Sequence, residues 1–161
     1  MSKQKPNPRL VPELVPSPLW GKSVHKTIKR SQWDREIRKK VLDQANNICA
    51  TCGASYEKGM ICHEEWEYVD DAHIARLIGF RLICRDCNFV NHYGKAGTLG
   101  RAEDALLHLS KVNQIKEEAA KDIISASIDK WIERSSIEDW KIEISPKLIA
   151  EYPILHDVDL S

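Results

Sequence analysis

The stretch ICRDCNFVNHYGKAG, residues 83–97, places several metal-ligand side chains in one short segment. Cys84 and Cys87 form a Cys-x-x-Cys pair, and Cys49 and Cys52 form a second pair upstream. Two such pairs supply four thiolates in the spacing that tetrahedral Zn²⁺ uses. We therefore predict one structural zinc ion that ties two distant segments together, with iron–sulfur ligation as the alternative.

The four cysteines leave other polar residues of this region unassigned, above all His63, Asn88 and His92. Asn88 and His92 are four positions apart, so they project from one face of the helix expected after Cys87. Residues 59–69 have the pattern of a strand that carries His63. With a second strand at the cysteine pair, the zinc clamp turns His63 toward that helix. The result is a strand–strand–helix unit with a gap between His63 and the helix.

The remaining elements follow from periodicity. Residues 31–47 predict a helix with one apolar stripe, residues 70–79 a short helix, and residues 80–84 the second strand of the unit. Two further helices and a terminal strand are expected after residue 100. The sequence thus predicts an α+β protein in three parts. A Pro-rich basic arm spans residues 1–30, a zinc-bound domain with its leading helix spans 31–100, and a helical extension spans 101–161.

A gap of this kind suits phosphodiester hydrolysis. A histidine is a good general base because imidazole titrates near neutrality. An imidazole together with an amide or carboxylate oxygen suits a loosely held Mg²⁺, Mn²⁺ or Zn²⁺ ion with open coordination positions. That ion would neutralise the charge that develops on the phosphate and on the leaving oxygen.

At three segments the chain resembles the HNH (His-Me finger) nuclease family: CATCG at 49–53, CHEEW at 62–66 and LICRDCNFVNHYG at 82–94. The resemblance implies a zinc-stapled ββα-metal core flanked by α-helices, and a DNA endonuclease. It also implies that His63 is the general base. Asn88 falls where the family usually has its last histidine, and His92 on an additional histidine, so both are expected at a catalytic Mg²⁺, Mn²⁺ or Zn²⁺ ion.

The chain departs from the family pattern at two positions. Cys62 stands where a metal-binding aspartate commonly precedes the base, and Gly79 stands near the usual middle asparagine. In an alternative register His63 binds the metal and Glu64 is the base. The departures also favour a second interpretation, in which the chain is a non-catalytic zinc module that binds nucleic acid or protein.

The charge distribution points to a polyanionic partner. The whole chain has 24 basic and 24 acidic residues, but residues 1–47 carry eleven of the basic and four of the acidic ones, a net charge of +7. A basic region of this kind can contact nucleic-acid phosphates. The phosphate contacts that we predict are Arg35, Arg38, Lys39, Lys40 and Lys95.

Composition bears on the compartment and on other partners. No apolar run approaches the ~20 residues needed to span a bilayer, so no membrane contact is expected. Five cysteines with two Cys-x-x-Cys pairs favour a reducing compartment, and we expect a cytoplasmic protein. A protein partner could dock on the acidic C-terminal helices, and cleavage of both DNA strands would favour a homodimer.

Overall fold

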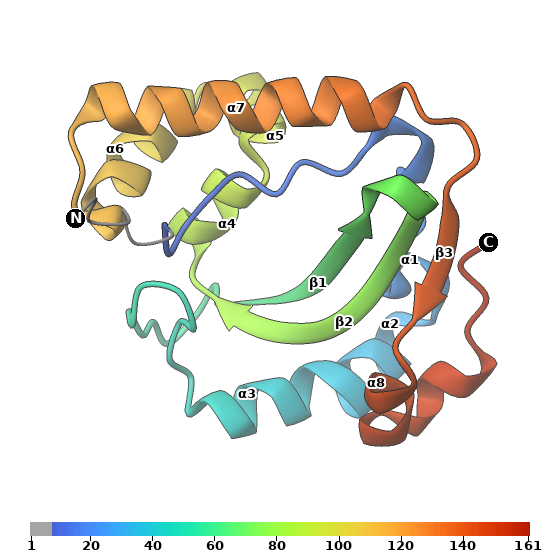
Figure 1. Ribbon diagram of the computed structural model, residues 1–161. Helices are drawn as coiled ribbons and strands as arrows, with labels where there is room; N and C mark the ends of the chain where they lie inside the picture. The colour runs from blue at the N-terminus through green and yellow to red at the C-terminus, as the bar shows by residue number, and fades with distance from the viewer. Residues whose placement is uncertain (1–7) are drawn as a thin grey trace, which may run out of the picture.

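A long β-hairpin lies at the centre of the computed structural model, which describes residues 8–161 (Figure 1). Strands β1 (Ile61–Val69) and β2 (Ile74–Ile83) pair antiparallel, and β3 (Lys141–Ile144) joins the far side of β2 in parallel, in the order β1-β2-β3. The register places His63 opposite Arg81 and shifts between Glu65 and Trp66. The fold is therefore mixed α+β with a small sheet.

Helices cover both faces of this sheet (Figure 1). On one side α4 packs against β1, while α3 and α8 pack against β2 on the other. The α-helices are α1 (Val24–Thr27), α2 (Arg30–Gln32), α3 (Lys39–Ala45), α4 (Arg85–Asn91), α5 (Tyr93–Thr98), α6 (Ala102–Asn113), α7 (Glu117–Ser135) and α8 (Pro146–Glu151). None of the helices in residues 8–161 is long and apolar enough to cross a membrane.

The hairpin is longer than the sequence pattern indicated. The short helix predicted over residues 70–79 is wrong: Asp70–Ala72 forms a single 3₁₀ turn, and β2 already begins at Ile74. His73 closes the turn in the left-handed region with a φ of 53°. Ala75 and Leu77 are then fully buried, which is the period-two burial of a strand with one covered face. Six added strand residues therefore extend the arm of the hairpin.

The predicted helix over residues 31–47 is present as one helical stretch with an unusual middle. Between α2 and α3, Trp33–Arg38 form a π-helical segment. The apolar residues Trp33, Ile37 and Val41 repeat every four positions, a longer period than the ~3.6 residues of an α-helical turn. The wider π turns, with i→i+5 bonds, keep all three on one face. All three are buried in the core.

The N-terminal segment is extended but packed into the body of the protein. Residues 8–16 have no regular structure, in keeping with their prolines, and they run between α7 and the hairpin (Figure 1). Leu10 is 1% exposed, and its backbone exchanges two hydrogen bonds with the Asn113 side chain. The indole of Trp131 on α7 donates to the Val15 carbonyl at 2.9 Å. This segment, residues 8–16, is called the strap below. Residues 1–7 of the predicted arm lie outside the described residues.

Candidate metal centre and histidine cleft

The four predicted zinc ligands converge on one point. The sulfurs of Cys49, Cys52, Cys84 and Cys87 all lie within 4.8 Å of one another. Cys49 and Cys87 are 3.8 Å apart, and Cys52 and Cys84 are 3.6 Å apart. A zinc tetrahedron with Zn–S bonds of ~2.3 Å has edges of about 3.8 Å. The cluster can therefore hold a metal ion, and four thiol ligands with this geometry suit zinc.

Local backbone geometry forms each half of the cluster. Gly53 donates its N–H to the Cys49 carbonyl at 2.9 Å and adopts a φ of 79°, which glycine tolerates without strain. The N–H of Cys87 points at the Cys84 sulfur at 3.5 Å, where α4 begins. The two halves meet because Ala50 donates to the Leu82 carbonyl, at 2.8 Å.

The four thiols of the cluster can ionise together only when a cation is bound between them. Burial opposes ionisation of Cys49, but backbone N–H groups, first that of Cys52, lower the pKa of its thiol to about 7. Burial raises the pKa of Cys84 to about 11. Burial and the neighbouring Cys49 also raise the pKa of Cys87. Four thiolates so close together are stable only when a bound cation compensates their charge.

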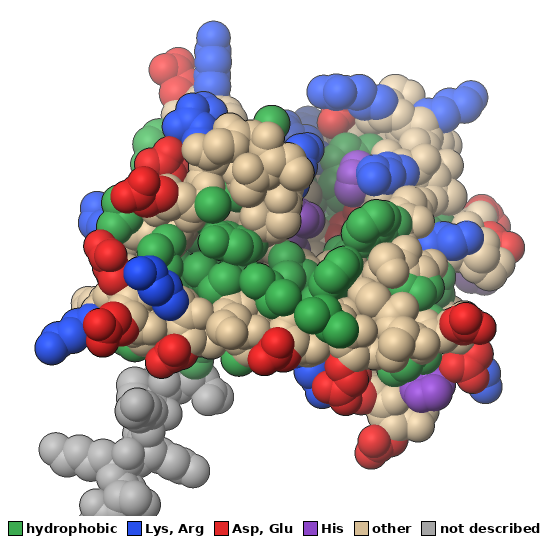
Figure 2. Space-filling model, turned by 90° about the horizontal axis from the view of Figure 1, so that it is seen from above, with side chains coloured by type: hydrophobic (Ala, Val, Ile, Leu, Met, Phe, Trp, Pro, Cys, Tyr) green, Lys and Arg blue, Asp and Glu red, His purple; other side chains and the backbone are tan. Residues whose placement is uncertain are grey.

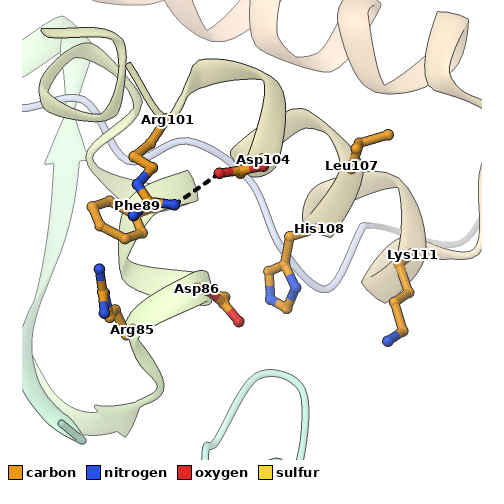
Figure 3. A pocket seen from close by; sticks show the side chains of 8 residues that line it. All are labelled: Arg85, Asp86, Phe89, Arg101, Asp104, Leu107, His108 and Lys111. Atoms are coloured by element: carbon orange, nitrogen blue, oxygen red, sulfur yellow. Dashed lines mark hydrogen bonds and ion pairs between the residues drawn. The ribbon is translucent and has the colours of Figure 1, made fainter. Parts of the chain in front are cut away.

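A residue that the sequence did not single out lies against this cluster. His108, on α6, has its Nε2 atom 3.2 Å from the sulfur of Cys87. No spacing in the sequence connects His108 to the cysteines. His108 also lines an open pocket of about 450 Å³ between the start of α4 and α6 (Figure 3).

The two predicted histidines of the gap lie side by side. The ring centroids of His63 on β1 and His92 at the end of α4 are 5.4 Å apart, at an interplanar angle of 49°. His63 is 8% exposed, and its Nδ1 has no hydrogen-bond partner within residues 8–161. Figure 2 shows histidine side chains near Lys and Arg side chains around a hollow in the face seen from above. We use the name histidine cleft for His63, His92 and the residues that contact their rings.

Burial keeps both cleft histidines in their neutral form. It lowers the pKa of His63 to about 3, and the positive charge of Arg81 acts in the same direction. Burial also lowers the pKa of His92, helped by Lys95, His25 and Lys26. Neutral imidazole rings are the forms that accept a proton or bind a metal ion.

The strap places a carboxylate beside His63. Oε2 of Glu13 lies 3.6 Å from Nε2 of His63, and Oε1 accepts a hydrogen bond from Arg81 at 2.7 Å. The backbone N–H of Glu13 donates to the Asn91 carbonyl at 2.9 Å. With its amide oriented to satisfy both neighbours, the fully buried Asn91 donates to the Val11 carbonyl at 3.0 Å and accepts from Arg81 at 3.3 Å. Sequence reasoning missed Glu13 because its partners are far away along the chain.

Glu64 points away from the cleft. Successive residues of a strand face opposite sides, so Glu64 lies opposite His63. Its buried carboxylate accepts hydrogen bonds from the Val24 N–H at 2.9 Å and from the His25 N–H at 3.4 Å. It also contacts Nδ1 of His25 at 2.6 Å. In this arrangement Glu64 fixes α1 and the His25 ring.

The structure also shows where Cys62 and Gly79, which depart from the HNH pattern, and Asn88 lie. Cys62 is on the Glu64 face of β1, and burial raises the pKa of its thiol to about 12, so it is a neutral group and not a ligand of the cleft. Gly79 lies opposite Glu65, whose carboxylate would lie 3.0 Å from an added Cβ. Asn88 is partly buried on α4, one turn before His92.

Most of the predicted phosphate contacts lie away from the cleft. Arg35, Arg38, Lys39 and Lys40 belong to the π segment and α3, on the sheet face where Trp33 packs edge-on against Phe80. Three of them contact the chain itself: Arg35 pairs with Glu36, Arg38 donates to the Met60 carbonyl and Lys40 donates to the Glu151 carbonyl. Lys95 on α5 is the one member of the set near His92.

No protein family, curated protein or solved structure matches this chain.

Proposed function

We propose that the protein is a metal-dependent endonuclease of the HNH type that hydrolyses phosphodiester bonds in DNA. The observation that supports this most directly is the 5.4 Å separation of the His63 and His92 rings. His63 lies on the hairpin and His92 at the end of α4, and the hairpin joins α4 at the cysteine cluster. This arrangement supports the proposal because the resemblance implies a histidine on a strand that lies opposite a metal-binding helix.

In this proposal His63 takes the proton of the attacking water. Its ring is neutral at pH 7, and Nδ1 is buried without a hydrogen-bond partner within residues 8–161, so this nitrogen can accept the proton when Nε2 carries the hydrogen and water reaches the ring. Glu13 then faces Nε2 and stabilises the positive ring that forms, the role a carboxylate has beside a catalytic histidine. Arg81 holds Glu13 in place from the other side.

Asn88 and His92 would hold the catalytic divalent ion. When bound, Mg²⁺, Mn²⁺ or Zn²⁺ supplies charge neutralisation at the phosphate and at the leaving oxygen. The amide oxygen and the neutral imidazole lie one helical turn apart and so share a face of α4. Lys95 on α5, whose positive charge acts on His92, is the predicted phosphate contact nearest this site.

One observation favours the second candidate, a zinc-bound module that binds nucleic acid or protein without cleaving it. The strap covers the His63 side of the cleft, and Glu13 occupies the position next to the ring. A negative carboxylate there repels a phosphate unless the strap shifts or a cation binds between them. On this reading the hairpin and α4 are a scaffold.

Plasmid nicking separates the two candidates. Purified protein is incubated with supercoiled plasmid and Mg²⁺ or Mn²⁺, next to His63→Ala and a matched control, His156→Ala. His156 is exposed and contacts only the adjacent Asp157 side chain among the described ion pairs, at 3.5 Å. We expect metal-dependent nicking by the wild type and by His156→Ala, and its loss in His63→Ala. Retained DNA binding without nicking in either ion would support the module.

A further inference from the structure

We infer that His108 belongs to the metal centre, as the residue that donates a hydrogen bond from Nε2 to the Cys87 sulfur and thereby strengthens metal retention. The contact measures 3.2 Å between a ring nitrogen and a fully buried sulfur, a hydrogen-bonding distance for sulfur. The inference concerns the cysteine cluster alone and holds whether or not the histidine cleft is catalytic.

The direction of this hydrogen bond follows from the chemistry of a metal-bound thiolate. A cysteine sulfur bound to a metal has lost its hydrogen and can only accept. Nε2 of His108 must therefore carry the hydrogen in the metal-bound protein. Four thiolates and one Zn²⁺ ion leave a net charge of −2 in a buried site, so an N–H donor aimed at one sulfur offsets part of that charge.

The position of His108 is set by the packing of α6. Leu109 is fully buried and Ala105 is 2% exposed, so these residues fix the face of α6 that packs on the core. His108 then projects from the edge of that face toward α4. In the close-up, its ring lies between α6 and the Asp86 side chain at the start of α4 (Figure 3). The Nε2 side of the His108 ring therefore faces the Cys87 sulfur, and the ring also lines the pocket.

His108 completes the surroundings of the metal without displacing a ligand. The four sulfurs already provide the separations of a tetrahedron, and three of the four cysteines are buried. A direct Zn–N bond of ~2.0 Å from His108 would require one sulfur to leave. The same N–H donor also lowers the nucleophilicity of the Cys87 thiolate, which slows its loss to competing metals and oxidants.

Zinc release by His108 variants tests this inference. The zinc-loaded wild type, His108→Leu and His108→Gln are challenged with a chromogenic zinc chelator, after circular dichroism has verified that each is folded. We expect His108→Leu to hold zinc about 10–100-fold less tightly, the usual cost of losing a residue that supports a ligand. His108→Gln, which keeps an N–H donor, should recover part of the loss. Leu107→Ala, an uncharged change in the same pocket and helix, is the matched control and should retain wild-type affinity.

Two results would overturn the inference. The first is zinc affinity in His108→Leu that is indistinguishable from the control. The second comes from Co²⁺-substituted protein, whose thiolate-to-metal absorption reports the number of sulfur ligands. Equal thiolate absorption in wild type and His108→Leu is expected. Gain of thiolate absorption in the variant would mean that His108 is itself a ligand in the wild type.

Discussion

The cysteine cluster and the histidine cleft lie on the same hairpin–helix unit, yet they are built in different ways. Each half of the cysteine cluster is a tight local turn, in which Gly53 and the start of α4 set the sulfurs. The histidine cleft depends on residues that are far apart in the chain, because Glu13 of the strap contacts Arg81 across 68 positions. Local turns make metal ligands easy to read from a sequence. A cleft closed by a distant segment is not.

The largest difference between the two regions should appear on removal of a single ligand. Cys84→Ser is expected to abolish tight zinc binding and to unfold residues 48–97, because structural zinc contributes on the order of 10 kcal/mol to small modules. Metal analysis should find about one zinc per wild-type chain, as one four-thiolate site requires. Cys62→Ser, outside the cluster, is the control and should keep its zinc. A Cys84→Ser protein that folds normally in strong chelator would contradict a structural role for the metal.

Loss of the strap's contact through Glu13 should lower the free energy of unfolding less than loss of the metal does, but by a measurable amount. Glu13→Ala removes the carboxylate that pairs with Arg81 at 2.7 Å, and we expect a loss of about 1–3 kcal/mol in the free energy of unfolding. Glu65→Ala is the matched control, because Glu65 contacts the same arginine at a longer distance, 3.5 Å. Its cost should stay below about 1 kcal/mol. Urea denaturation of both variants measures the difference. Equal losses would mean that the strap is not held through Glu13.

Low pH should destabilise the folded protein, because the buried rings of His63 and His92 are neutral in the folded state. The folded-state pKa of His63 is about 3, below its usual 6.5, so the unfolded chain binds a proton that the folded chain excludes. Stability therefore falls as the pH drops from about 6.5 toward 3, and His63 should account for about 2 kcal/mol between pH 7 and 5. His92 acts in the same direction. The loss should be correspondingly smaller in His63→Gln, measured by urea denaturation at both pH values. An unchanged loss would indicate that the His63 ring is not buried in solution.

The smallest effect concerns phosphate binding. If nucleic acid lies over the histidine cleft, Lys95→Ala should reduce the salt dependence of DNA binding by about one phosphate contact, a change of about 0.9 in the log–log slope. Arg35→Ala, on the opposite face of the sheet and already paired with Glu36, should leave the slope unchanged. Fluorescence anisotropy with a short duplex at several salt concentrations gives both slopes. The reverse pattern would place the interface on the π segment, within the basic region that the charge distribution indicated.

The correction at residues 70–79 shows what periodicity misses. The segment DDAHIARLIG contains enough helix-compatible residues to predict a short helix, and its length allowed one. In the structure Ala75 and Leu77 are covered on one face and pair with β1, so tertiary packing overrides the local preference. The same packing accounts for the strap. Its prolines predicted extended backbone, but not the burial of Leu10 against the body.

The sequence by itself determined the two halves of the cysteine cluster and the hairpin–helix order. These features depend on short spacings and on backbone geometry, which neighbouring residues set. Only the tertiary structure decided that Glu13 lies beside His63, that Glu64 faces His25, and that His108 contacts Cys87. Such contacts arise when distant segments pack together. Their partners are fixed by the burial of a whole core, and no local pattern records them.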